Sequence, residues 1–207
     1  MRANDAVTQM RTVDPEHHAA RRAQILNGAA VAFAQKGYDN TTVKDVYTAA
    51  GVGSGTLFHY FADKRAIFHG VLEADRDALL SDLAAIDVTD ARTAMWAVVD
   101  RMTADLHDPA VGSMMLAILG QLTVDPRVAE ILDEGDAATR VLLADLIGQL
   151  QAAGDADPDW DPVHAARWAQ LMVDGLYLRC SDADFDADTE LSRLRIVLSR
   201  ALLLRES

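Results

Sequence analysis

The chain is 207 residues long, is 50% hydrophobic and carries a formal net charge of −13. A chain of this length has room for one or two domains, and its longest apolar runs are too short to span a membrane. The N-terminal segment lacks the apolar stretch of a signal peptide, and the one cysteine, Cys180, excludes an internal disulfide. We therefore expect a cytoplasmic protein without membrane contact, in which Cys180 is an inert thiol or, alternatively, a redox sensor.

The charge is distributed unevenly along the chain. Residues 1–65 hold eight Lys or Arg and six acidic residues, whereas residues 66–207 hold eleven Arg and 26 acidic residues. A basic N-terminal part suits contact with a polyanion, and an acidic remainder would repel DNA from other directions. The negative charge of residues 66–207 is explained equally well if it only keeps the domain soluble.

Two short helical patterns joined by a glycine occur in the segment GYDNTTVKDVYTAAGVGSGTLFHYF. Thr42 and Asp45 have the spacing of a capping box at the start of the first pattern, and Gly51 suits a turn with positive φ. In the second pattern Leu57 and Phe61 share the inward face, while polar side chains and an aromatic ring point outward. Because such an outward face suits the DNA major groove, the segment predicts a helix-turn-helix.

This segment and its flanks, about residues 20–68, resemble the N-terminal signature of TetR-type transcriptional regulators. The shared elements are Gly-Tyr, Thr-Thr-Val, Asp-Val, Ala-Gly-Val, Gly-Thr-Leu and Tyr-Phe, followed by a Lys. Gly53 departs from the family pattern where a Ser often caps the recognition helix, and Phe58 replaces a Tyr that can contact phosphate. The resemblance implies a DNA-binding domain followed by a helical domain that binds a small effector and forms a homodimer.

Asp-Pro pairs mark several predicted helix starts, because Asp caps a free N–H and Pro lacks only a donor that has no partner there. Gly37 and Gly154 are predicted to end helices, and no stretch alternates as a strand does. The fold is predicted to be all-α, with an arm and a three-helix helix-turn-helix domain over residues 1–65 and a larger helical effector-binding and dimerisation domain over residues 66–207. The predicted helices cover residues 15–36, 42–50, 53–60, 63–84, 90–107, 109–122, 126–152, 162–180 and 188–205.

The outward residues of the helix-turn-helix are the predicted contacts to double-stranded operator DNA. A Lys can donate to guanine, a His can donate or accept, and a Thr can touch a thymine methyl, whereas residues flanking the reading face bind phosphates. The predicted base readers are Lys44, Thr56 and His59; the residues shaping the contact are Ser54, Gly55 and Phe58; and the phosphate contacts are Thr42, Tyr60 and Lys64.

Methionine and tryptophan side chains are frequent in the second domain. Interiors of this composition suit pockets for varied apolar ligands, although the same periodicity also describes a plain core. The TetR resemblance favours an effector pocket among these residues. The predicted pocket residues are Met95, Trp96, Met102, Met114, Met115, Trp168 and Met172.

The apolar stripes of the last two predicted helices are broader than one buried face requires. A second copy of the chain would cover the remainder and form a two-fold four-helix interface. The residues of the two stripes are Val163, Ala166, Ala169, Met172, Val173 and Leu176, followed by Leu191, Leu194, Val197, Leu198, Ala201 and Leu202.

Catalytic and metal-binding motifs are missing from the sequence. The aspartate-rich tracts at 155–161 and 182–188 lack the Gly and Glu of a calcium loop, and no phosphate loop, G-x-S-x-G or H-E-x-x-H occurs. No catalytic residue, metal ligand or cofactor is therefore predicted. We expect a repressor that a small, largely apolar ligand releases from a palindromic operator. The alternatives are a DNA-binding activator or architectural protein without effector, and an all-α enzyme or lipid carrier.

Overall fold

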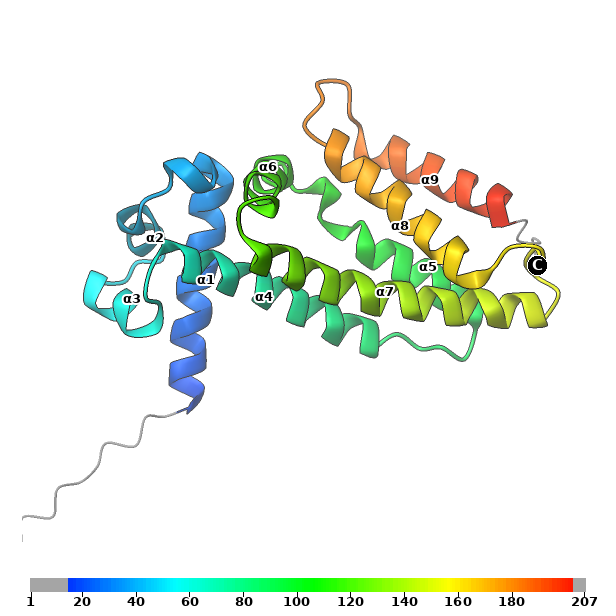
Figure 1. Ribbon diagram of the computed structural model, residues 1–207, viewed down its shortest axis with the longest axis horizontal. Helices are drawn as coiled ribbons and strands as arrows, with labels where there is room; N and C mark the ends of the chain where they lie inside the picture. The colour runs from blue at the N-terminus through cyan, green and yellow to red at the C-terminus, as the bar shows by residue number, and fades with distance from the viewer. Residues whose placement is uncertain (1–14, 203–207) are drawn as a thin grey trace, which may run out of the picture.

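The computed structural model describes residues 15–202, so the predicted N-terminal arm lies outside the described residues. Within this range the chain is all-helical, as the periodicity predicted, with nine α-helices and one 3₁₀ helix. Figure 1 shows α1–α3 as a head at one end, from which α4 leads into a second helical bundle. The elements are α1 (Pro15–Asn40), α2 (Val43–Ala49), α3 (Ser54–Tyr60), α4 (Lys64–Ala84), α5 (Ala91–Met102), η1 (Ala104–His107), α6 (Val111–Leu122), α7 (Pro126–Ala152), α8 (Pro162–Arg179) and α9 (Ala187–Leu202).

Aspartate side chains begin most helices of the second domain. Asp161 accepts from the backbone N–H of His164 at 2.9 Å at the start of α8, and Asp125 caps α7. The Asp-Pro prediction is wrong by two residues at α6, which begins at Val111 without a side-chain cap. There Asp108 accepts from the N–H of Ala110 at 2.8 Å and holds the intervening proline in a turn.

Two predicted helix ends also differ from the structure. Gly37 has a φ of 73°, as expected of a stop, but helical structure resumes and α1 continues through a kink to Asn40. The predicted helix 90–107 is divided, because α5 ends at Met102 and η1 follows. At this break the Thr103 hydroxyl donates to the Val99 carbonyl at 2.9 Å.

The hydrophobic core of the head extends beyond the helix-turn-helix. Phe33 is fully buried and packs edge-on against Phe68 of α4, with ring centroids 5.0 Å apart. Residues of α6 and α7, including Ala117 and Ile131, belong to the same cluster. The head therefore shares its hydrophobic core with the start of α4 and with residues of α6 and α7.

A glycine permits a close contact between two helices of the head. A Cβ on Gly28 of α1 would lie 2.5 Å from the backbone N and Cα of Ala50, at the end of α2. The Gln24 side chain also donates to the Ala50 carbonyl, at 2.8 Å. This close approach holds α2, and with it the turn before α3, against α1.

A second hydrophobic cluster forms the centre of the larger bundle. It combines residues of α4, α5, α7, α8 and α9, and α7 packs against both α4 and α8. In Figure 1, α8 and α9 lie on one side of this bundle, away from α4. No helix within residues 15–202 is long and apolar enough to cross a membrane.

Candidate DNA-binding site

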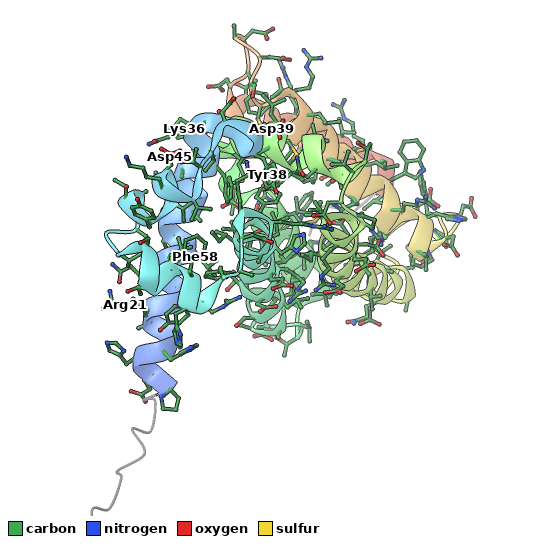
Figure 2. The ribbon with its side chains drawn as sticks, turned by 60° about the vertical axis from the view of Figure 1, so that its left-hand side comes forward. Arg21, Lys36, Tyr38, Asp39, Asp45 and Phe58 are labelled. Carbon is green, nitrogen blue, oxygen red and sulfur yellow. The ribbon has the colours of Figure 1, made fainter. Side chains whose placement is uncertain are left out.

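The start of α2 has the predicted capping box. The Thr42 hydroxyl oxygen accepts from the N–H of Asp45 at 3.2 Å, and the Asp45 carboxylate accepts from the N–H of Thr42 at 2.8 Å. Lys36 of α1 forms an ion pair with Asp45, and Figure 2 shows the two side chains next to each other. Together with two hydrogen bonds from Thr42, Lys36 holds the pKa of Asp45 well below its usual range. These contacts attach α2 to α1.

A glycine turn joins α2 to α3. Gly51 has a φ of 64°, which glycine adopts without strain. The N–H of Val52 donates to the carbonyl of Tyr47 at 3.0 Å across the turn, a hydrogen bond typical of a helix end followed by glycine. The predicted helix-turn-helix geometry is therefore present.

The outward face of α3 carries most of the predicted DNA contacts. Leu57 and Phe61 are buried as predicted, and the Phe58 side chain is 55% exposed. Gly53 stands at the N-cap and gives no side-chain hydrogen bond. Ser54, Gly55, Thr56 and His59 of α3 are exposed as well, Tyr60 is half-buried, and Lys44 is exposed on α2.

The N-terminal end of α1 adds a residue that the sequence pattern did not indicate. The ring of His18 lies 4.5 Å from that of Tyr60 and 6.3 Å from that of His59, measured between centroids. Figure 2 shows this end of α1, which carries Arg21, next to α3, which carries Phe58. His18 and Arg21 therefore border the reading face, although no local sequence signal relates them to α3.

Two predicted phosphate contacts already have partners within the chain. The Lys64 ammonium donates to the carbonyls of Tyr38 and Asp39 at 2.8 and 3.2 Å, and it lies 4.5 Å from the centroid of the Tyr38 ring. The Thr42 hydroxyl donates to Asp45 at 2.7 Å. Lys64 thus binds the last turn of α1, and its contact with phosphate stays a prediction.

The predicted pocket residues do not share one location. Met95, Trp96, Met102 and Met172 pack in the core of the larger bundle, whereas Met114 packs in the core of the head. Met115 is half-buried, and Trp168 is 53% exposed on α8. A cavity of about 550 Å³ lies instead between the η1–α6 segment and the α8–α9 loop. Its lining includes none of the seven predicted residues.

Most residues of the predicted dimerisation stripes pack in the core of the monomer. Ala166, Ala169 and Val173 of α8, and Leu194, Leu198 and Leu202 of α9, are buried in the monomer core. Val163 and Val197 of the predicted stripes are exposed, together with four apolar side chains outside the stripes. This exposed apolar face consists of Val163, Trp168, Leu171 and Leu178 on α8 and Ile196 and Val197 on α9.

Candidate reactive groups outside the helix-turn-helix are the metal-ligating side chains and the thiol of Cys180. Among residues 15–202, no three His, Cys, Asp or Glu side chains are grouped so that they could hold a metal ion. Burial raises the pKa of the Cys180 thiol, and this thiol donates to the carbonyl of Tyr177 at 3.0 Å. A raised pKa disfavours the thiolate, so it favours the inert role for Cys180.

Known proteins resemble this chain over most of its length. The HTH-type transcriptional repressor Rv1474c of Mycobacterium tuberculosis is 29% identical over 84% of this chain and 90% of the relative. A TetR-family transcriptional regulator from Rhodococcus sp. superimposes with a TM-score of 0.71 at 26% identity, covering 87% of this chain and 98% of that one. A regulator from Saccharomonospora viridis, solved in complex with choline, shares the fold with a TM-score of 0.76 at 20% identity, covering 91% and 100% of the two chains.

Two family descriptions match the two parts of the molecule. Residues 25–71 match bacterial regulatory proteins of the tetR family, and residues 91–203 match the C-terminal domain of BetI-type transcriptional repressors. The first match includes the helix-turn-helix, and the second covers more than half of the chain. The family consists of transcriptional regulators, which agrees with the prediction that the chain is not an enzyme. The chain belongs to the TetR family of bacterial transcriptional regulators.

Proposed function

We propose that the protein is a repressor that binds a palindromic operator as a homodimer and leaves it when a small ligand binds. The observation that carries the proposal is the exposed face of α3, which holds Thr56, Phe58 and His59 on a helix fixed by the buried Leu57. A short helix presented in this way fits the major groove. We also propose that the protein acts in the cytoplasm.

Base recognition is assigned to Lys44, Thr56 and His59. His18 lies beside this reading face. The contacts of His18 with Tyr60 and His59 orient both side chains beside the reading face. Thr42, Tyr60 and Lys64 remain the proposed phosphate contacts. Because Lys64 also binds α1, replacing it would disturb the head as well as the DNA contact.

Replacing His59 by alanine is expected to change base preference rather than to weaken binding to all sequences alike. Loss of one base contact costs about 1–3 kcal/mol at the base pair concerned. The measurement is selection of duplexes from a random library with the wild-type and variant proteins, followed by titration of the selected sites.

The matched control is His164→Ala, because His164 is an exposed histidine on α8, outside the head. It should select the same sequences as the wild type. If the His59 variant merely binds all sequences more weakly by one factor, His59 does not read a base. If the wild type selects no sequence at all, the proposed function itself is wrong.

The effector is proposed to be a small, largely apolar molecule bound in the second domain. Four of the predicted pocket residues belong to one hydrophobic cluster of this domain, and a separate cavity of about 550 Å³ lies between the η1–α6 segment and the α8–α9 loop. Asp108, Asp186 and Asp188 line this cavity together with the Phe185 ring, so a cationic group on the ligand is favoured over an anionic one.

The arrangement of α6 supports ligand-induced release. The first residues of α6 line the cavity, and the same helix packs along α1 of the head. A ligand that prefers a displaced α6 would therefore bias the position of the head, and operator DNA would weaken ligand binding by the same factor.

A thermal-shift screen of small apolar amines and their neutral analogues should identify compounds that raise the unfolding temperature. Compounds that bind are expected to lower operator affinity in a direct titration, because they would favour the displaced α6. Binding without any change in operator affinity would contradict ligand-controlled release and favour the effector-free alternative.

A further inference from the structure

A buried carboxylate connects the start of α4 to the start of α7. Asp125, which is 4% exposed, accepts from Arg65 Nε at 2.7 Å through one oxygen and from Arg65 Nη2 at 2.8 Å through the other. His69 Nε2 lies 2.7 Å from the same carboxylate. The N–H of Arg127 donates to it at 3.1 Å and begins α7. One side chain therefore caps α7 and binds two residues of α4.

The ion pair between Arg65 of α4 and Asp125 at the start of α7 has a defined geometry. Two hydrogen bonds from Arg65, and then one with His69, hold the pKa of Asp125 well below its usual range despite its burial. The carboxylate is therefore ionised in the folded protein. A two-donor arginine–carboxylate pair fixes orientation as well as distance, so the first turn of α4 is held at a defined angle to α7.

This junction lies where the head joins the second domain. Arg65 is the second residue of α4, and only Ala62 and Asp63 separate that helix from Phe61, the last buried residue associated with α3. A rotation of the first turn of α4 would therefore be transmitted to the reading helix over a few residues.

The other ion pairs between α4 and α7 lie farther from the head. Arg127 binds Glu73 at 3.0 Å, and Arg76 binds Glu134. These pairs hold the helices together along their length. Neither pair involves the first turn of α4. That turn forms its ion pair through Arg65, which binds Asp125 at the start of α7.

We propose that Asp125 and Arg65 are positioning residues that select the half-site spacing of the operator. The inference rests on the homodimeric repressor proposed above. In a dimer, the angle between α4 and α7 sets the separation of the two copies of α3. A fixed angle restricts binding to one spacing, and a loosened junction permits a wider range.

Two substitutions distinguish the positioning role of Asp125 and Arg65 from the role of Asp125 as the N-cap of α7. Asp125→Asn removes the charge but leaves a side chain that is a good N-cap. Arg65→Lys keeps the charge but loses the two-donor geometry. The matched control is Glu134→Gln, which breaks an exposed ion pair of the same two helices beyond the junction.

The readout is the ratio of affinities for the selected operator and for operators with one base pair inserted or deleted at the centre. The wild type and Glu134→Gln should both show a several-fold preference for the native spacing. In Asp125→Asn and Arg65→Lys that ratio should fall toward one, with a smaller change in affinity for the native operator.

The outcomes distinguish the two proposals. A spacing preference unchanged in folded, dimeric Asp125→Asn or Arg65→Lys overturns the positioning role, as does an equal loss of affinity at every spacing. If Asp125→Asn does not fold, Arg65→Lys decides alone. If the wild type is monomeric or binds no operator, the proposed function fails instead.

Discussion

Replacing Gly28 by alanine is expected to separate α1 from α2 and to abolish operator binding. The added methyl group would lie 2.5 Å from backbone atoms of Ala50, which cannot move as a flexible side chain would. Overpacking of this kind costs about 1–3 kcal/mol, and sometimes more. Urea unfolding measures the loss of stability, and titration with the selected operator measures the loss of binding.

Gly120→Ala is the matched control for this substitution. Gly120 is exposed on α6, and a Cβ there would meet no atom within 4 Å. Alanine in a helix should raise the free energy of unfolding by about 0.5–1 kcal/mol relative to glycine. Equal stability of the two variants would show that α1 and α2 are not in close contact at Gly28.

Replacing Leu171 by glutamate is expected to give a folded monomer that no longer binds the palindromic operator. Leu171 is 51% exposed in the exposed apolar face of α8 and α9 defined above. If a second copy covers this face, each glutamate would bury an unpaired charge, which costs several kcal/mol per interface. Sedimentation at micromolar concentration gives the oligomeric state, and circular dichroism verifies the fold.

The control for the dimer interface is Val88→Glu. Val88 is also exposed, but it lies in the connection between α4 and α5 rather than on the last two helices. This variant should sediment as the wild type does. A dimeric Leu171→Glu, or a monomeric wild type that still binds a symmetric site, would contradict dimerisation through α8 and α9.

Features governed by neighbouring residues could be predicted from the sequence. The capping box of Thr42 and Asp45, the positive φ of Gly51 and the inward position of Leu57 follow from contacts within a few residues, and the structure confirms all three. The same local reasoning placed the start of α6 too early, because Asp108 caps a turn instead of a helix.

Features that depend on distant partners could not be predicted. The Asp-Pro pattern predicts Asp125 as the cap of the helix over residues 126–152, but its partners Arg65 and His69 lie 60 and 56 residues away. The Lys64 ammonium faces the end of α1 across 26 residues. The pocket prediction rests on the frequency of methionine and tryptophan, which gives no direction for a side chain, so it includes Trp168 although this residue lies on the surface.

The shared core of the head bears on the engineering of hybrid regulators. Phe33 packs on Phe68, and Ala117 and Ile131 complete the same cluster from α6 and α7. A chimera joined after residue 65 would place a foreign head on a surface shaped for this one. Grafting DNA specificity onto another member of the family therefore requires transplanting the matching residues of α4, α6 and α7 together with the helix-turn-helix.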